Sequence, residues 1–161
     1  GKALFYSNNS LKLYEEINYK SGISATLNLI GNIYRTLCDY KKAIEIHENS
    51  LTIANEIHNK MLRAINLISS GYDYLMKAVA GVEPLQGAEP IQGVLRPLQE
   101  GLTIAQEMGA GLMGLEALFC IALAHHLALD ADLWKRRTSV LVRHCSPPSP
   151  PSRTLPRRHP S

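Results

Sequence analysis

Two adjacent histidines are followed closely by two aspartates, and these are residue types that can bind a metal ion. His125 and His126 precede Asp130 and Asp132, and imidazole and carboxylate groups are common zinc ligands. Adjacent residues of a helix point about 100° apart, so the two imidazoles cannot both face one ion. We therefore expect no metal site, and histidines that pack in a core or line a groove.

No set of residues in the sequence has the spacing of a known catalytic site. We find no nucleophile-base set, no glycine-rich phosphate loop and no paired carboxylates in a plausible cleft. The pair Ser69-Ser70 is explained as helix surface. Cys38, Cys120 and Cys145 lie far apart, as expected of buried or incidental thiols in a reducing compartment. We expect a cytoplasmic protein that is not an enzyme and has no cofactor.

Charge is distributed unevenly along the 161 residues. Residues 1–80 carry 9 basic and 7 acidic groups, residues 81–134 carry 1 and 7, and residues 135–161 carry 7 basic groups and no acidic one. The basic end lacks an aromatic platform, which disfavours nucleic acid as a partner. No apolar run free of charge approaches the roughly 20 residues that cross a bilayer, so we expect no membrane partner.

A repeat of forty residues is the clearest pattern in the sequence. Sliding the chain by forty residues places Gly31 on Gly71 and Tyr34 on Tyr74. Each period contains two stretches with apolar or small residues at every third or fourth position, which predicts two amphipathic helices. The predicted helices are 2–18, 22–37, 39–58, 60–78, 90–108, 112–129 and 131–144.

An insertion interrupts the repeat after its second period. Leu51-Thr52-Ile53-Ala54 returns as Leu102-Thr103-Ile104-Ala105, an offset of 51 residues rather than 40. The inserted segment, residues 79–93, contains two prolines and several glycines. That composition predicts a loop or a broken helix.

The array continues beyond the insertion. Ala122 takes the place of Gly31, which makes residues 112–129 another first helix. The segment 131–144 is expected to cover the last apolar face of the array. Residues 146–161 are rich in proline and arginine and cannot bury a core, so we expect a disordered tail with polyproline II character.

The repeat resembles the tetratricopeptide repeat, in its variant of about forty residues. In that variant the first helix carries Leu-x-x-Leu-Gly-Asn-x-Tyr, the turn ends in Asp-Tyr, and the second helix begins Lys-Ala-Ile. The matching residues here are Leu27, Ile30, Gly31, Asn32, Tyr34, Asp39, Tyr40, Lys42, Ala43 and Ile44. The resemblance implies an all-α fold, an α-α superhelix of helical hairpins over residues 1–145.

The same resemblance gives the repeated small and aromatic residues a packing role. Gly31 and Gly71 are expected where a neighbouring helix backbone approaches closely, because a glycine inside a helix otherwise costs about 1 kcal/mol relative to alanine. Tyr34, Ala43 and Tyr74 are expected to pack between helices.

In the family, first helices line a concave groove that receives an extended peptide or a partner helix. The resemblance therefore implies a protein-binding scaffold, with amides that hydrogen-bond the ligand backbone. A carboxylate clamp is disfavoured because only one of the inner positions is basic. The groove is expected to be polar at one end and apolar at the other, which suits an amphipathic or leucine-bearing ligand. Its residues are Asn28, Asn32, Arg35, Ile68, Tyr72 and Phe119.

Other functions remain open at this stage. The chain begins in mid-repeat and without a starting methionine, as a spacer or regulatory segment of a larger signalling protein would. An apolar face near Leu4, Leu11 and Ile17 is expected to pair with another copy of the chain. In the tail, Pro148-x-x-Pro151-x-Arg153 has the spacing of a ligand for an SH3-type domain, against a passive tail or one that binds nucleic acid.

Overall fold

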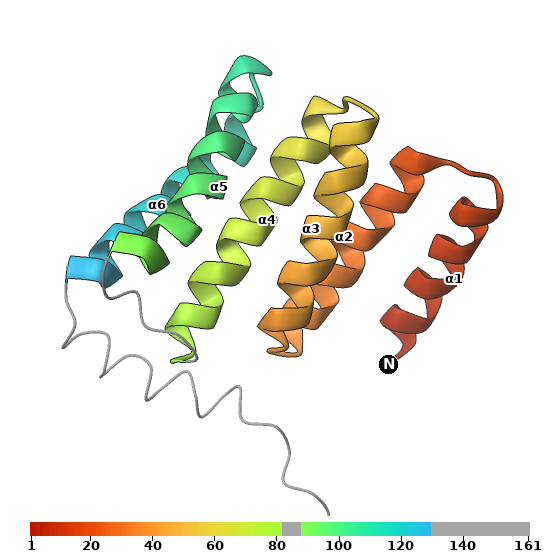
Figure 1. Cartoon of the computed structure of the whole chain (residues 1–161), viewed down its shortest axis with the longest axis horizontal. Helices are drawn as coiled ribbons and strands as arrows, with labels where there is room; N and C mark the ends of the chain where they lie inside the picture. Colours follow the sequence, from red (N-terminus) through yellow and green to blue (C-terminus); the bar gives the residue numbers. More distant parts are fainter. Residues whose placement is uncertain (82–87, 130–161) are drawn as a thin grey trace, which may run out of the picture.

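Six helices in antiparallel succession make up residues 1–81 and 88–129, the part of the chain that this computed structural model describes. The all-α prediction is confirmed, and each helix overlaps a predicted range with ends that differ by two residues or fewer. The predicted helix 131–144 and the tail 146–161 lie outside the described residues. The helices are α1 (Lys2–Glu16), α2 (Lys20–Thr36), α3 (Tyr40–Glu56), α4 (Lys60–Val79), α5 (Ala88–Glu107) and α6 (Gly111–Leu129) (Figure 1).

Four of these helices end in the same way. Asn18, Cys38, His58 and Gly109 each follow a helix with a positive φ, between 51° and 66°. The next residue then donates its backbone N–H to a carbonyl five residues earlier, at distances of 2.8 to 3.0 Å. This left-handed ending satisfies carbonyls that the last turn leaves open and reverses the chain within a few residues.

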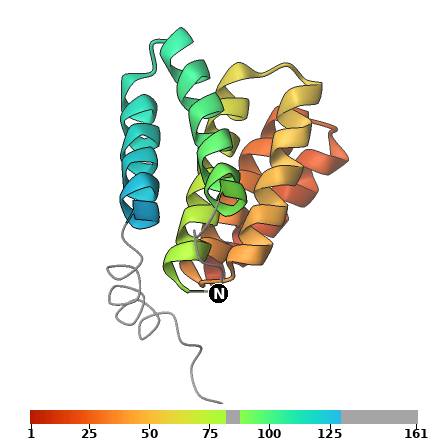
Figure 2. The ribbon, with the colours of Figure 1, turned by 60° about the vertical axis from the view of Figure 1, so that its left-hand side comes forward.

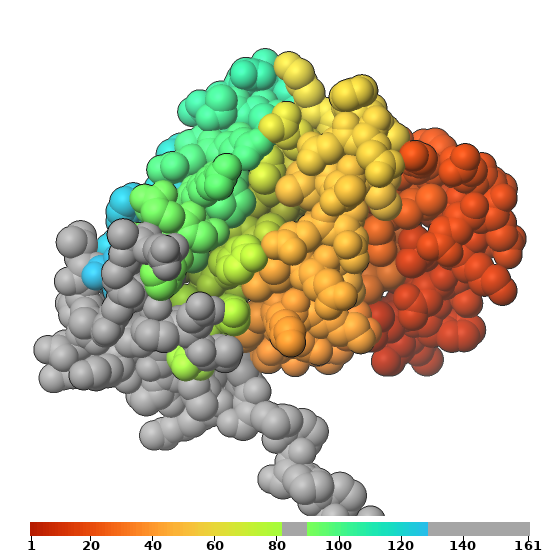
Figure 3. All heavy atoms as spheres, viewed as in Figure 1, coloured from red at the N-terminus to blue at the C-terminus, as the bar shows by residue number. Residues whose placement is uncertain are grey.

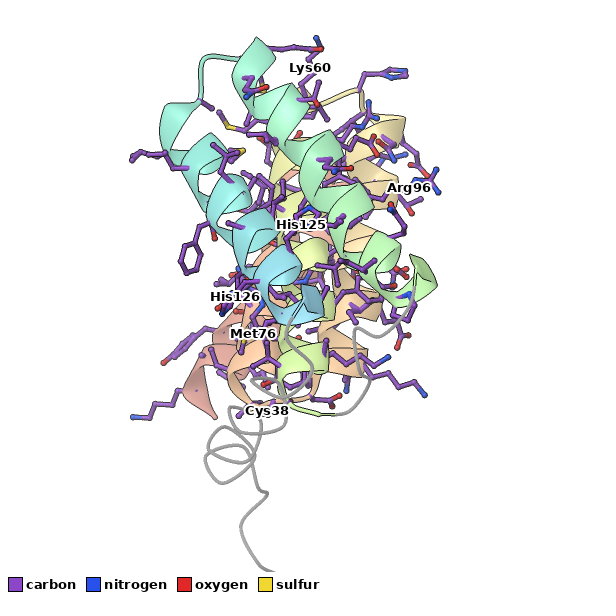
Figure 4. All side chains as sticks on the ribbon, turned by 90° about the vertical axis from the view of Figure 1, so that its left-hand side faces the viewer. Cys38, Lys60, Met76, Arg96, His125 and His126 are labelled. Atoms are coloured by element: carbon purple, nitrogen blue, oxygen red, sulfur yellow. The ribbon has the colours of Figure 1, made fainter. Side chains whose placement is uncertain are left out.

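Side chains also cap the N-termini of the two helices α3 and α4. Asp39 accepts a hydrogen bond from the backbone N–H of Lys42, and Asn59 accepts one from Leu62. Such caps fix where α3 and α4 begin. Figure 4 shows the result: Cys38, in the link before α3, lies at one end of the bundle, and Lys60, at the start of α4, lies at the other.

The helices form a row of sequential hairpins. Each helix packs against its neighbours in sequence, and α4 also contacts both α2 and α6. Among the described helices, α1, α3 and α5 make no contact with one another. The sequence colours therefore run in order across the space-filling view from α1 to α5 (Figure 3), and α5 and α6 lie side by side at the end of the row (Figure 2).

The interior changes character along the row. Around α4, α5 and α6 it is apolar, with Leu75 and Leu98 fully buried. Between α2, α3 and α4 it is largely polar, with buried His47 and Asp73. At the α1 end, Ser7 is the buried residue of the helix, and apolar side chains on α1 stay exposed.

Gly31 and Gly71 make room for side chains of the following helix. A Cβ at Gly31 would lie 2.5 Å from Nε2 of His47, and a Cβ at Gly71 would lie 2.6 Å from Cγ of Leu98. The backbone nitrogen of Leu98 would be 3.3 Å away. At Gly31 the gap is therefore filled by a buried imidazole rather than by the expected helix backbone, whereas at Gly71 both the side chain and the backbone of Leu98 approach closely.

The insertion contains less irregular structure than its composition predicts. Helix α5 begins at Ala88 and runs through Pro97, so it starts two residues before the predicted helix 90–108, within the segment whose composition predicted a loop or a broken helix; residues 82–87 lie outside the described part. Pro90 falls in the first turn of α5, where a backbone N–H has no intrahelical partner to lose. Proline at that position is compatible with a regular helix.

Replacement of Gly31 by alanine tests the first of these close contacts. Gly31→Ala is expected to lower the free energy of unfolding by about 1–3 kcal/mol, because the buried ring of His47 must shift. Gly93→Ala is the matched control, since among the described residues a Cβ there meets no neighbouring atom within 4 Å. That variant should gain up to about 1 kcal/mol from helix propensity. Urea unfolding measures both; equal effects would contradict the packing argument.

Candidate interaction face

The predicted site residues lie along the row of first helices, α2, α4 and α6. Asn28, Asn32 and Arg35 of α2 and Tyr72 of α4 are all partly buried, and Asn28 and Arg35 make hydrogen bonds to α4. Ile68 is 3% exposed and packs under α5, where a Cβ at Gly101 would approach it to 2.7 Å. Phe119 of α6 is 67% exposed. The structure thus brings the α2 and α4 residues together and leaves Phe119 on the far helix.

The two predicted amides are connected to each other and to α4. Asn28 donates from Nδ2 to Oδ1 of Asn66 at 3.0 Å and to Oγ of Ser69 at 3.2 Å. Asn32 donates from Nδ2 to Oδ1 of Asn28 at 3.3 Å. These bonds hold Asn28 in one orientation. The amide oxygen of Asn32 has no hydrogen-bond donor among the described residues.

Arg35 is held by an ion pair and an aromatic ring. Its Nε donates to Oδ1 of the buried carboxylate of Asp73, and its Nη2 donates to the carbonyl of Ser69 at 3.1 Å. The guanidinium also lies 4.7 Å from the ring centroid of Tyr72, a cation-π contact. These contacts neutralise the one basic side chain among the predicted groove residues.

His47 connects the same carboxylate to the backbone of α2. Its Nδ1 faces Oδ2 of Asp73, and its Nε2 lies 3.1 Å from the carbonyl oxygen of Asn28. A carbonyl only accepts, so Nε2 carries a hydrogen. Nδ1 is hydrogen-bonded to the carboxyl group of Asp73. One carboxylate on α4 therefore ties together side chains from α2 and α3.

A second set of buried polar contacts lies one to two turns away. Ser24 donates to the backbone carbonyl of Ser50 at 3.0 Å, and Ser50 donates to that of Ser24 at 2.7 Å. Asn66 donates to the carbonyl of Leu62 at 2.8 Å. In the described part of the chain, every buried side-chain nitrogen or oxygen has a hydrogen-bond partner. The polar interior is thus fully satisfied, as a stable core requires.

Sequence reasoning missed Asn66 and Asp73 as members of this network. Both are fully buried, and they lie on the α4 face turned toward α2 and α3. The sequence feature that could have identified them is a polar residue at a position where the apolar periodicity of the helix predicts a buried side chain. That signal identifies a buried group but not its partner, which lies on another helix.

An apolar hollow opens between α4 and α6. Its volume is about 480 Å³, and Glu116 contributes the charged side chain among its lining residues. Ser69 also lines it, and Ser69 is the residue that receives hydrogen bonds from Asn28 and Arg35. The polar end of the face and the hollow are therefore adjacent. The lining residues are Ile65, Ile68, Ser69, Ala110, Gly111, Leu112, Met113 and Glu116.

The residues with a predicted packing role lie between helices or at their edges. Ala43 is fully buried. Tyr34 lies with its ring centroid 4.4 Å from Nζ of Lys42, and the contact with Tyr34 raises the pKa of Lys42. Tyr74 donates a hydrogen bond to Glu48 at 2.9 Å.

The histidine pair occupies the last turn of α6. His125 and His126 are both exposed, near the end of the helix (Figure 4). Within residues 1–81 and 88–129, no three histidine, cysteine, aspartate or glutamate side chains come together as a metal site. The neighbouring Asp130 and Asp132 lie outside that part.

No protein-family model matches this chain, and no curated protein matches it.

The carboxylate of Asp73 is expected to be a main contributor to stability. Asp73→Ala should lower the free energy of unfolding by about 3 kcal/mol or more, because it leaves Arg35 and His47 without their buried partner. Glu48→Ala, which removes the exposed hydrogen bond to Tyr74, should cost less than about 1 kcal/mol. Urea unfolding of the two variants checks this, and similar losses would show that the buried network contributes little.

Cys120 provides a test of how well α6 is packed. Burial, with a smaller contribution from the charge of Glu116, raises the pKa of the Cys120 thiol to about 11. At pH 8 about one thiol in a thousand is then ionised, and the thiolate is the form that reacts. Iodoacetamide should therefore leave Cys120 unmodified in the folded protein and label it in urea, as peptide mass spectrometry would show. Rapid labelling without urea would contradict the packing of α6.

Proposed function

We propose that this chain is a tetratricopeptide-like helical solenoid that acts as a protein-binding scaffold. The row of contacts between α2, α4 and α6, without contacts among α1, α3 and α5, supports the solenoid. Such an arrangement curves toward its first helices and presents them as one surface. On this proposal the surface binds an extended peptide or a partner helix and performs no catalysis.

The hollow between α4 and α6 is the observation that carries the proposal. It is lined mostly by apolar side chains and is continuous, through Ser69, with the hydrogen-bonded residues of α2. A concave apolar site with a few fixed polar groups is the usual form of a binding site. An apolar side chain of the ligand enters this hollow.

The polar residues divide between two roles. Asn28 and Arg35 position the surface, because their side chains bind α4. Asn32 and Tyr72 contact the ligand, and Phe119 extends the apolar end. Since the polar groups are already ordered in the free protein, binding loses little side-chain entropy on the scaffold side.

The charge of the surface favours a basic ligand. Arg35 is paired with Asp73, whereas Glu116 is exposed and has no ion-pair partner among the described residues. A lysine or arginine next to the apolar anchor of the ligand would pair with Glu116. The ligand on this proposal is therefore a peptide with a leucine-like anchor and a neighbouring cation.

Peptide selection followed by titration tests the proposed function. Peptides are selected from a displayed random library on the full chain, and their affinities are measured by calorimetry. Selected peptides should carry an apolar residue beside a basic one. Ile65→Ser and Glu116→Lys should each weaken binding about tenfold or more, since they alter the lining of the hollow.

Glu45→Lys is the control for the charge reversal. Glu45 is exposed on α3, outside the row of first helices, and its reversal should leave affinity within about twofold. Equal binding by all variants would place the ligand elsewhere on the molecule. Failure to select any peptide would count against a groove-binding scaffold.

Self-association is a second candidate, supported by α1. Ile17, Leu13, Phe5 and Tyr6 are each more than half exposed, although Leu4 and Leu11 of the expected face are partly buried. An exposed apolar face of this kind favours pairing with a second copy. A monomer in light scattering at high protein concentration would exclude it.

A further inference from the structure

Helix α1 exposes a stripe of residues that no described helix covers. Its members recur at alternating steps of three and four residues, which places them on one side of the helix. Ser7, the buried residue of α1, and the partly buried Leu4 and Leu11 lie on the neighbouring side. Among the described helices α1 contacts α2 alone, so this neighbouring side serves α2. The exposed residues, which we name the α1 stripe, are Ala3, Tyr6, Ser10, Leu13 and Ile17.

Helix α3 shows what the corresponding stripe does when a first helix precedes it. The forty-residue repeat aligns Ser10 of α1 with Ser50 of α3, and Ser50 is fully buried and exchanges hydrogen bonds with Ser24 of α2. The neighbouring side of α3 packs toward α4 through Leu51. The stripe of α3 is therefore its contact with α2, and all of its residues are buried or partly buried: Ala43, Ile46, Ser50, Ile53 and Ile57.

Helix α6 exposes a face that could receive such a stripe. Leu115 is 63% exposed and Leu118 is 47% exposed, and Ala122 is exposed one turn further along. Their counterparts on α4, at the offset of 51 residues, are buried under α5, where a Cβ at Gly101 would lie 3.3 Å from the carbonyl of Ala64. The α6 face, defined by these three exposed residues, thus corresponds to one that a second helix covers in α4. The counterparts are Ala64, Leu67 and Gly71.

The two uncovered surfaces belong to complementary kinds of helix. In the described row each first helix packs against the second helix that follows it, α2 against α3 and α4 against α5. By its place in the repeat α1 is a second helix, whereas α6 is a first helix. The two lie at opposite ends of the row and make no contact with each other (Figure 1). A pairing of α1 with α6 therefore joins two copies of the chain.

Side-chain sizes are compatible with this pairing in the register of the other hairpins. Gly71 of α4 faces the buried side chain of Leu98 of α5. The same register between two copies places Ala122 of one against Ser7 of the other. Alanine is larger than glycine, and serine is smaller than leucine, so the two changes act in opposite directions on the volume between the helices. The spacing of the hairpin can thus be preserved.

A hollow between α5 and α6 gives the α1 stripe a place to insert. Its volume is about 310 Å³. In the preceding repeat, Ile104 and Met108 of α5 pack among the residues that correspond to its lining. Leu13 and Ile17 of α1 are the counterparts of Ile104 and Met108. The hollow is therefore equivalent to a site that a second helix fills, and its lining includes Leu102, Leu115 and Leu118.

The composition of α6 favours a protein rather than a lipid surface as the occupant of this face. By length and composition alone, Gly111–Ala128 could cross a membrane. It contains no lysine or arginine, the residues with which an interfacial helix binds anionic lipid. It also carries the exposed carboxylate of Glu116, which an anionic surface would repel. The apolar stripe of a protein helix meets neither difficulty.

We propose that α1 of a second copy packs on the α6 face and continues the array head to tail. Ser7 then lies on Ala122 and Ser10 lies on Leu115, while Leu13 enters the hollow. This pairing rests on self-association, the second candidate function, and assigns to it a second face. Each added copy leaves one α1 and one α6 open, so association produces longer arrays or rings rather than a symmetric dimer.

The contact between copies is apolar. Ion pairs of Arg63 with Glu100 and of Lys60 with Glu107 flank the contact between α4 and α5, but α6 has a glycine at both equivalent positions. Association should therefore persist in about 1 M sodium chloride, where charges are screened beyond about 3 Å. Dissociation in salt would contradict the apolar contact.

Mixing of two variants tests the pairing. Leu13→Asp blocks the α1 stripe and Leu118→Asp blocks the α6 face, so each variant alone should associate about tenfold or more weakly than the unmodified chain. Their equimolar mixture should form a dimer, because the intact α6 of the first variant binds the intact α1 of the second. The dimer should be the largest species, since its remaining faces are blocked. Sedimentation velocity measures the three samples, and circular dichroism checks that each is folded.

Phe5→Asp and Leu112→Asp are the matched controls. Phe5 is 62% exposed on α1 but lies outside the α1 stripe, and its counterpart Glu45 is exposed on α3. Leu112 is 87% exposed on α6, and its counterpart Met61 remains 51% exposed beside α5. Both changes should leave association within about twofold of the unmodified chain.

An exchange of residues across the contact tests the register. Ser10→Leu alone should weaken association about tenfold or more, because two leucines then meet at Leu115. Adding Leu115→Ser to the same chain should restore association, because a serine again faces a leucine. Failure of the second change to restore it would contradict the proposed alignment of α1 with α6.

Other arrangements predict different results. A monomer at every concentration would overturn the pairing and self-association together. Association that Leu13→Asp abolishes and Leu118→Asp retains would assign the contact to two α1 helices, and the reverse result would assign it to two α6 helices. In both cases self-association would stand and the head-to-tail pairing would fall. A monomer that binds anionic phospholipid vesicles, and loses this binding in Leu118→Asp, would assign the α6 face to lipid.

Discussion

The buried carboxylate of Asp73 is the constraint on which the first half of the structure depends. This side chain of α4 accepts a hydrogen bond from Arg35 of α2 and shares another with Nδ1 of His47 on α3. A charge removed from water is very costly unless it is paired. Sliding any one of these helices by a turn would break a pair, so the carboxylate fixes the relative register of the three.

The next hairpin solves the same packing problem with different chemistry. Where Gly31 admits the imidazole of His47, Gly71 admits the isobutyl group of Leu98. The geometry of close approach is preserved between the repeats, while the polar network is replaced by an apolar core around Leu75 and Leu98. The repeat therefore preserves a spacing between helices rather than a set of contacts, because close packing constrains volume first.

The difference between the polar interior around α2 to α4 and the apolar interior around α4 to α6 also affects the surface of the first helices. On α2 the polar side chains are used to hold α4, so Asn28 and Arg35 present a fixed edge rather than free hydrogen-bonding groups. Between α4 and α6 the surface remains open and apolar, with Glu116 at its margin. The face is thus held by hydrogen bonds to α4 at one end and is open and apolar at the other.

The sequence alone determined the helices, because apolar periodicity, the cap at Asp39 and the recurrence of glycine at one phase are local features. It also indicated that Gly31 and Gly71 share a role. Only the tertiary structure decided which groups meet: Arg35 and Asp73 are 38 residues apart, and His47 and Asp73 are 26 apart. It likewise showed α5 beginning at Ala88, two residues before the predicted helix 90–108 and within the segment whose prolines and glycines predicted a loop or a broken helix. Such outcomes depend on how helices are spaced and aligned in the folded hairpins, and a periodic pattern within one helix carries no information on its partner's register.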